Sequence, residues 1–364
     1  MDILQHLDYS RYDVDLLLLE EEGDYASNLP PQVHVQLRCL KNTYGSLGQS
    51  LLRCVRQRDW FCFQMRLIFL LMKLFGQKKI SLAKRMLTGG KHYDCVIGYR
   101  RGICTQIASF AVDADRCLSW WHHGAVNVEA EPYLHETSNC NKIAVVSDST
   151  RRMLADAIPQ LASKLVTIPN MLDVGKVEIQ ADAFNPYKKE HVFHIVSIGG
   201  CVPEKHFQNA IYAAKQLKAA GVSFQWHLVG DGVLQNQLVR CAEDSGVTDC
   251  FIFEGNQPNP YPFLKNADLF VHPSYVESQG LVVLEAMALG VPCVVTKSLG
   301  PCEFIEDGVN GLLTEQSPES LTEQVLRILQ DKGLYGKIKA NTRCPEQFAP
   351  ERVMQKIDKL LEGQ

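Results

Sequence analysis

The sequence lacks several features that mark other classes of protein. It contains 13 cysteines, but they are scattered singly from Cys39 to Cys344 and no two form a C-x-x-C pair. This spacing suits neither a zinc site nor a disulfide framework, so we interpret the cysteines as small buried hydrophobic residues in a reducing compartment. The net charge of the 364-residue chain is only −4, which argues against a dedicated nucleic-acid-binding protein.

Long hydrophobic runs are also missing. The longest apolar run, residues 61–75, is interrupted by Arg66 and Lys73 and falls short of the roughly 20 residues that a membrane-spanning helix needs. The opening residues MDILQHLDYS lack the basic and apolar regions of a signal peptide. We therefore expect a cytoplasmic protein.

Acidic residues are almost absent from one segment. Residues 38–91 contain twelve Lys or Arg and a single acid, Asp59. A basic segment in a nearly neutral protein predicts contact with an anionic surface, most simply phospholipid head groups at the inner face of the membrane. We expect a helical block at about 46–88, and its apolar run at 61–75, with basic residues in and around it, suits a helix that lies in the membrane interface. A domain helix with a solvated basic face explains it equally well, and the two interpretations are compatible.

A regular alternation of short apolar segments with helical segments runs through the C-terminal half. We expect strands at residues 191–198, 224–229, 250–254, 268–272 and 292–296, and helices at about 204–220, 233–245, 260–266, 280–289, 318–331 and 350–362. The N-terminal half alternates less cleanly, with strands expected at 14–19, 33–37, 95–99, 117–121, 142–147 and 164–168. This order predicts α/β architecture with two doubly wound, Rossmann-like domains.

The most informative motif is SYVESQGLVVLEAMALGVP, residues 274–292. It places Glu277 on a loop after a strand and Glu285 about one turn into a helix that Gly280 starts. Amide groups at the start of this helix, from Gly280 and Leu281 onward, favour phosphate. Glu285 can accept hydrogen bonds from both ribose hydroxyls, and Glu277 can reach hydroxyls of a sugar beyond the diphosphate. The motif therefore predicts a sugar-nucleotide site.

In this motif the chain resembles the retaining nucleotide-sugar glycosyltransferases of family 4, which have the GT-B fold. The resemblance continues in VSIGGCVPEK, HLVGDG and FEGNQPNPYPFLKNADLFVHPS before it, and in GPCEFIEDGVNGLL after it. It is dense in the C-terminal half and loose in the N-terminal half. It implies an acceptor-side domain at 1–175, a linker at 176–189, a donor-binding domain at 190–345, and a helix at 346–364 that packs back on the first domain.

Glycines and one lysine complete the expected donor site. Gly199 and Gly200 follow a strand and let the backbone turn close to a ligand, and Gly230 opens a second turn of this kind. The resemblance implies an arginine and a lysine that neutralise the departing diphosphate. Lys205 is the lysine, but Gly200 stands where the arginine is expected, so we expect weaker stabilisation of the leaving group unless Arg100 or Arg101 replaces it.

The N-terminal half supplies the acceptor side. His123, in SWWHHG, matches a Trp-x-His-Gly pattern of the family, with His122 as the alternative, and a neutral imidazole there can orient a hydroxyl. The chain opens with a short helix at residues 2–7 and then the strand DVDLLLLE. The family's first strand and Gly-rich loop are therefore expected to be missing. A misplaced start, a fragment and a naturally shortened enzyme all explain this.

The resemblance implies an enzyme that moves a hexosyl or N-acetylhexosaminyl group, most simply from a UDP-sugar, to a lipid-linked or glycan acceptor with retention. Bacterial surface polysaccharide assembly is the expected setting. The donor is the only small-molecule partner expected, without a metal, although the D-x-D triplets at 13–15 and 113–115 resemble metal motifs. A catalytically inactive partner subunit and a GT-B sugar-nucleotide epimerase are the alternative interpretations.

Overall fold

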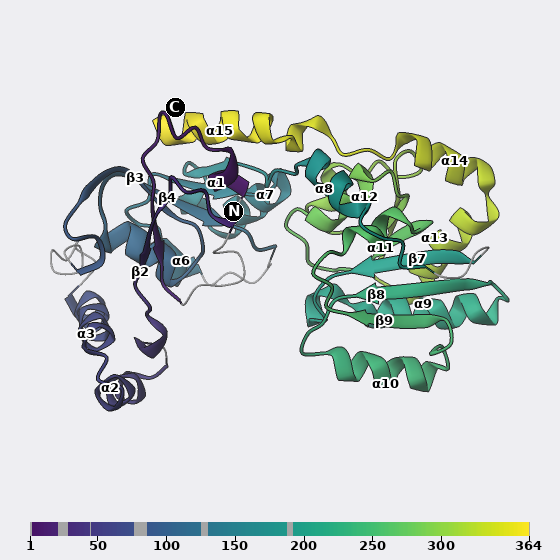
Figure 1. The fold of residues 1–364 in the computed structure, drawn as a ribbon, viewed down its shortest axis with the longest axis horizontal. Coiled ribbons are helices and arrows are strands. Elements are labelled where there is room, and N and C mark those ends of the chain that lie inside the picture. Colours follow the sequence, from purple (N-terminus) through teal and green to yellow (C-terminus); the bar gives the residue numbers. More distant parts are fainter. Residues whose placement is uncertain are drawn as a thin grey trace.

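The computed structural model describes residues 2–20, 28–43, 45–75, 86–124, 130–187 and 192–363. Two α/β units lie beside each other in Figure 1, the N-terminal unit on the left and the C-terminal unit on the right. The last helix, α15 (Pro350–Glu362), returns along the top to the N-terminal unit. The expected two-domain α/β architecture is confirmed.

The elements of the N-terminal unit follow the predicted alternation. Its helices are α1 (Asp2–His6), α2 (Leu47–Arg56), α3 (Trp60–Phe75), α5 (Ile103–Gln106), α6 (Ala130–Glu136) and α7 (Asp148–Ala157). Its strands are β1 (Asp15–Leu18), β2 (His34–Leu37), β3 (His92–Gly98), β4 (Asp113–Trp121), β5 (Lys142–Val145) and β6 (Leu165–Thr167). Short turns are the 3-10 elements η2 (Lys41–Thr43) and η4 (Pro159–Leu161) and the π-helical η3 (Ile107–Ala111).

The C-terminal unit alternates more regularly. Its helices are α8 (Val174–Ala181), α9 (Phe207–Ala219), α10 (Gln235–Ser245), α11 (Tyr261–Lys265), α12 (Leu281–Ala288), α13 (Pro318–Gln330) and α14 (Lys332–Asn341). Its strands are β7 (Phe193–Ile198), β8 (Phe224–Val229), β9 (Phe251–Gly255), β10 (Leu269–His272), β11 (Cys293–Thr296) and β12 (Leu312–Thr314). The 3-10 turns η5 (Pro203–Lys205), η6 (Pro301–Glu303) and η7 (Glu346–Phe348) connect them.

All strands of the C-terminal unit form one parallel sheet in the order β12-β11-β10-β7-β8-β9. The chain order reverses at β7, which pairs with both β8 and β10, so the switch point of this doubly wound sheet lies at the carboxyl end of β7. Helices α9, α10, α13 and α14 contribute apolar side chains to one core, and α8, α11 and α12 to another. The sheet is thus covered on both faces, which explains why its strands are almost continuously apolar.

The N-terminal sheet is divided in two. Strands β1 and β2 pair with each other, β3 to β6 form a separate four-stranded sheet, and all of these pairs are parallel. In the C-terminal sheet β7 is the first strand along the chain, and it lies between β8 and β10, the second and fourth strands along the chain. No strand among the described residues fills the equivalent place between β1 and β3. Side chains cross here instead: the Tyr93 hydroxyl and Lys91 both bond Asp15, at 2.7 and 2.9 Å.

The last helix joins the two units. Helix α15 contributes Val353, Met354, Ile357 and Leu360 to a buried cluster with side chains of β4 and β5. Arg11 pairs with Asp358 at 3.2 Å, which ties the segment after α1 to the same helix. The predicted return of the C-terminal helix to the N-terminal unit is therefore confirmed. Helix α8 overlaps the start of the segment expected to be a linker and packs on the C-terminal unit, because its Val177 joins the core of that unit.

The basic segment, expected to be helical at about 46–88, contains helices α2 and α3. Helix α2 ends at Arg56, Arg58 adopts a left-handed backbone conformation with φ of 54°, and α3 starts at Trp60. Buried side chains of both helices, including Cys54 and Met65, pack in one cluster with side chains of β1 and β3. Residues 76–85, where the predicted block continues, lie outside the described residues. No helix in the part of the chain that the structure describes is long and apolar enough to cross a membrane.

Candidate active site

The loops after β7 and β10 bring Lys205 and Glu277 together. Lys205 ends the turn η5, rather than lying in the following helix as expected, and Glu277 lies in the loop between β10 and α12. The ammonium group of Lys205 contacts Oε1 of Glu277 and is 3.3 Å from Oε2. These side chains are only 22% and 12% exposed, so water and salt screen the ion pair weakly. The sequence predicted both residues but not that they pair.

His272 lies beside the same carboxylate. Its Nε2 is 3.5 Å from Oε1 of Glu277, and its ring is completely buried. Burial alone would raise the pKa of Glu277, but hydrogen bonding and charge from His272 and Lys205 outweigh it and lower the pKa to about 2. Burial lowers the pKa of His272 itself. Glu277 is therefore ionised and can only accept hydrogen bonds.

The second carboxylate, Glu285, lies in the second turn of α12. The hydroxyl group of Tyr261 donates a hydrogen bond to its Oε1 at 3.2 Å. Burial raises the pKa of Glu285 above its ordinary value. Gly280 precedes the helix with φ of 83°, a conformation that suits glycine, and Leu281 at the first helical position is 37% exposed. The first amide groups of α12 thus remain available to a ligand.

We expect the raised pKa of Glu285 to make nucleotide binding depend on pH. A carboxyl group with a raised pKa begins to protonate at a higher pH than usual, and the protonated form cannot accept both ribose hydroxyls. Affinity for UDP should therefore fall as the pH is lowered from 8 to 5. Titration calorimetry of the wild type and Glu285→Gln measures this. The substituted protein should bind UDP more weakly at pH 8 and lose most of the pH dependence. An equal slope in both proteins would contradict the role of Glu285.

The glycine-rich turns after β7 and β8 pack directly on each other. Gly199 has φ of 155° and Gly230 has φ of 137°, and a Cβ atom on Gly230 would lie 2.0 Å from the carbonyl oxygen of Gly199. A Cβ atom on Gly232 would lie 2.7 Å from the carbonyl oxygen of Cys201. Gly199, Gly230 and Gly232 are therefore required by the fold. Gly200 is different, because its nearest neighbours would be 3.8 Å away and the residue is exposed.

We predict that Gly200→Arg increases activity. The position has room for a side chain, and an arginine there would restore the second cation that the resemblance implies for the departing diphosphate. Loss of one such donor costs about 10²-fold in kcat in comparable sites, so we expect a gain of about tenfold with a flexible new side chain. Steady-state kinetics with a UDP-sugar measures the gain, and Gly200→Gln controls for bulk. Equal rates for the two variants would show that no cation is missing.

On the N-terminal side, β4 ends at Trp121 and is followed by His122, His123 and Gly124. The ring of His122 packs inward, 4.7 Å from the Tyr99 ring. His123 is more exposed, but partial loss of hydration and the charges of Arg101 and Arg100 lower its pKa, so its imidazole is neutral at pH 7. This is the protonation state expected for orienting a hydroxyl group. The geometry thus favours His123 over His122 as the residue that faces a ligand.

The two arginines, Arg100 and Arg101, follow the carboxyl end of β3. The Arg101 guanidinium lies 4.3 Å from the ring centroid of Trp121 and 5.0 Å from that of Tyr133. Both arginines act on His123 through their charge. They are therefore cations of the N-terminal unit near its expected catalytic residue.

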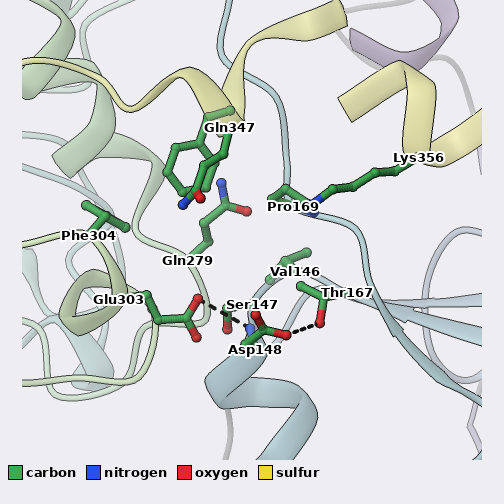
Figure 2. A pocket seen from close by; sticks show the side chains of 12 residues that line it. Val146, Ser147, Asp148, Thr167, Pro169, Gln279, Glu303, Phe304, Gln347 and Lys356 are labelled. Carbon is green, nitrogen blue, oxygen red and sulfur yellow. Dashed lines mark hydrogen bonds between the residues drawn. The ribbon is translucent and has the colours of Figure 1, made fainter. Parts of the chain in front are cut away.

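The two units meet backbone to backbone beside the ion pair. A Cβ atom on Gly124 would lie 2.9 Å from the backbone of Glu277 and Ser278. Next to this contact is a cavity of about 60 Å³ whose walls come from both units. Figure 2 shows Glu303 of the C-terminal unit facing Asp148 at the start of α7, with Gln279 reaching towards Pro169. The Asp148 amide donates to Glu303 at 3.3 Å.

Neither D-x-D triplet has the surroundings of a metal site. Asp13 and Asp15 pair with Lys91, and Asp113 and Asp115 pair with His92. Among the described residues, no group of three or more His, Cys, Asp or Glu side chains could hold a metal ion. These carboxylates link neighbouring strands instead.

Sequence reasoning missed three members of the site. Tyr261 bonds Glu285, His272 contacts Glu277, and Gln279 bonds the backbone of the other unit. All three contacts depend on how separate loops meet, which no local pattern records. The only signal in the sequence was that His272 and Gln279 lie close to Glu277 along the chain.

Comparison with known proteins finds relatives of the C-terminal unit. The profile described as "Glycosyl transferases group 1" matches residues 178–344. The lipopolysaccharide core biosynthesis glycosyltransferase LpsE of Rhizobium meliloti is 33% identical over 170 residues, which cover 46% of this chain and 49% of LpsE. The amylovoran biosynthesis glycosyltransferase AmsK of Erwinia amylovora is 27% identical over 208 residues, covering 52% of this chain and 51% of AmsK. The chain thus matches about half the length of these relatives.

Solved structures extend the likeness to both units. HepE of Anabaena, in complex with UDP and glucose, superposes with a TM-score of 0.71 at 17% identity, covering 100% of this chain and 96% of HepE. A glycosyltransferase from Rickettsia africae gives a TM-score of 0.70 at 14% identity, covering 100% and 93%. At such identities the likeness establishes the GT-B fold. The C-terminal unit is similar to the group 1 glycosyltransferases, whose profile matches residues 178–344.

Proposed function

We propose that this chain transfers a hexosyl or N-acetylhexosaminyl group from a UDP-sugar to a lipid-linked or glycan acceptor in surface polysaccharide assembly, with retention and without a metal. One observation carries the proposal. The Lys205–Glu277 ion pair lies beside the exposed start of α12, and Glu285 follows in the second turn of that helix. Lys205 and the free amides match a diphosphate, Glu285 matches the ribose, and Glu277 matches the sugar.

Each group then has one task. Lys205 and the first amides of α12 bind the diphosphate, and Glu285 accepts hydrogen bonds from the ribose. Glu277 is ionised and accepts hydrogen bonds from the transferred sugar once the donor separates it from Lys205. His123, with its neutral ring, orients the acceptor hydroxyl from the N-terminal side. The relatives named for lipopolysaccharide core and amylovoran synthesis support the setting.

The reaction requires no covalent intermediate on the protein. The bond between the anomeric carbon and the diphosphate oxygen breaks as the acceptor oxygen bonds to the same carbon from the same face. The acceptor's proton passes to the departing diphosphate oxygen, so atoms and charges balance and the configuration is retained. The protein contributes position and charge: Lys205 offsets the negative charge that grows on the diphosphate, and the closed cleft holds the two reactants together.

Detection of products by NMR tests the proposed transfer. The purified protein is incubated with a panel of UDP- and GDP-sugars and with glycan or polyprenyl-phosphate acceptors, beside a Glu285→Ala control. We expect UDP and an α-linked product from an α-linked donor, both lost in the control. An inverted product would reject retention. Donor binding without turnover on any acceptor would favour an inactive partner subunit, which Gly200 and the divided N-terminal sheet also support.

A second part of the proposal is that helices α2 and α3 dock on an anionic membrane. Trp60, Leu67 and Leu71 lie on one face of α3 and are 59%, 36% and 45% exposed. Leu52 and Val55 of α2 are also exposed, at 53% and 47%. We call these five residues the α2–α3 patch. Arg53, Arg56 and Arg58 border it. Asp59, the single acid of the segment, accepts a hydrogen bond from the Asn42 side chain. An apolar face with a basic rim suits the boundary between head groups and acyl chains.

Intrinsic fluorescence tests this docking surface. Trp60 is the only exposed tryptophan, since Trp120, Trp121 and Trp226 are at most 2% exposed. Vesicles containing phosphatidylserine should therefore shift its emission to the blue and protect it from acrylamide, whereas phosphatidylcholine vesicles should not. Replacing Leu52 and Leu71 with Asp should abolish the shift. The same change at Ile179 and Val233, which are 78% and 82% exposed on the C-terminal unit, should not. No shift in the wild type at low salt would reject membrane docking.

A further inference from the structure

The loop that carries Glu277 is held between the two units. On one side, a Cβ atom on Gly300 would lie 2.4 Å from Cα of Gln279. On the other side, Gly124 of the N-terminal unit packs against the Glu277–Ser278 peptide. The path of this loop is therefore set by both units at once. Only two residues, Ser278 and Gln279, separate Glu277 from Gly280 at the start of α12.

Both intervening residues bond the backbone of the N-terminal unit. Gln279 is 2% exposed and uses both ends of its amide on one residue: Oε1 accepts from the Asn170 amide at 2.6 Å, and Nε2 donates to the Asn170 carbonyl at 2.9 Å. The hydroxyl group of Ser278 donates to the carbonyl oxygen of His122 at 2.7 Å. The segment between the expected sugar-binding and phosphate-binding groups is thus bound to the opposite unit.

The Gln279 contact differs from the bridge that Glu303 makes between the units. Glu303 reaches the amides at the start of α7, but both partners are exposed, so water can replace these bonds at little cost. The Gln279 amide is buried and makes a paired contact with the backbone. Without this contact in the closed state, the backbone amide and carbonyl groups of Asn170 lose the hydrogen bonds that the Gln279 side chain makes.

We infer that Gln279, supported by Ser278, is a positioning residue that places Glu277 for sugar transfer only when the two units are closed on each other. The inference rests on the proposed function. Closure brings Asn170 to the Gln279 amide, the amide fixes the backbone of the loop, and the loop orients the Glu277 carboxylate towards the transferred sugar. In the proposed binding mode, groups of the C-terminal unit alone hold the UDP part of the donor. Donor capture and catalytic orientation are therefore separate steps, and Gln279 couples the second step to closure.

Two substitutions at Gln279 and one control test the inference. Gln279→Leu removes both hydrogen bonds and should lower kcat by about 30-fold, which corresponds to about 2 kcal/mol for two buried bonds. UDP affinity should change less than threefold. Small-angle X-ray scattering with saturating UDP should show a compact wild type and a more extended variant. Gln237→Leu, at an exposed position on α10, should behave as the wild type.

Gln279→Glu provides a readout that a general loss of structure would not give. The ionised carboxylate of this variant repels the Asn170 carbonyl, whereas the protonated carboxyl group again offers one acceptor and one donor in the same geometry. The kcat of this variant, divided by that of the wild type at each pH, should therefore rise as the pH falls from 8 to 5. A flat ratio, an unchanged kcat in Gln279→Leu, or equal scattering of wild type and variant would each overturn the inference. If the wild type transfers no sugar but the scattering difference appears, the proposed function fails and the role of Gln279 in closure stands.

Discussion

Replacing Lys205 with methionine should reduce sugar transfer by about 10²- to 10³-fold, mainly in kcat, because no other cation of the C-terminal unit is expected to face the departing diphosphate. Gly200 stands where a second cation is expected, so little compensation is available. The substitution also leaves the largely buried Glu277 without its cationic partner, so the pKa of Glu277 should rise. Initial rates with a saturating UDP-sugar measure the effect.

A matched control for this change lies on the next helix. Lys215 on α9 is exposed, and Lys215→Met should retain wild-type rates. UDP affinity should fall about tenfold in the Lys205 variant, since a charged contact to the diphosphate is lost in the ground state as well. A Lys205→Met protein with a wild-type rate would remove the central cation from the proposed mechanism.

Glu277→Gln should leave UDP affinity within threefold of the wild type and lower kcat by about 10²-fold. The amide has nearly the same shape, but it carries no charge and cannot accept from the sugar hydroxyls with both of its ends. The UDP moiety does not reach this residue in the proposed binding mode, which separates the result from that expected for Lys205. Calorimetry and steady-state kinetics on the same protein samples measure the two quantities. A large loss of UDP affinity would place Glu277 on the nucleotide instead.

The same substitution should change how stability depends on pH. Lys205 and His272 hold the pKa of Glu277 at about 2, below its ordinary value of 4.5. A lowered pKa in the folded state stabilises the protein above pH 4.5, and this contribution is lost as the pH falls towards 2. Urea denaturation between pH 6 and pH 3 should therefore show a shallower decline in the free energy of unfolding for Glu277→Gln. Parallel declines for the two proteins would contradict the lowered pKa.

Much of the fold could be predicted because the parallel strands are short, apolar and bounded by turns. The expected strand at 224–229 has the same bounds as β8, and the expected helix at 350–362 has those of α15. Strand β12 was not predicted, since three residues give no usable periodicity, and its place at the sheet edge comes from pairing with β11. Helix α8 was hidden in a polar segment, where Asp173 caps its first turn and packing on the C-terminal unit stabilises it.

The candidate site was less accessible to sequence reasoning than the fold. Spacing and resemblance pointed to Lys205, Glu277 and Glu285 separately, because each follows a strand or starts a helix of a recognisable pattern. Their partners could not be found this way: Gln279 bonds a residue 109 positions away, and His272 acts through burial as much as through contact. The roles of His123, Gly199, Gly230 and Leu281 stay predictions, although their positions in the two units are consistent with a shared cleft.

The most direct test of the account is whether the folded protein binds UDP through Glu285. Titration calorimetry at pH 8 requires neither a known sugar nor a known acceptor, so it separates donor recognition from turnover. We expect saturable binding to the wild type, binding at least tenfold weaker in Glu285→Ala, and unchanged binding in Glu243→Ala, an exposed site on α10. Absence of UDP binding to the folded wild type, or equal binding by the Glu285 variant, would contradict a UDP-sugar site on α12.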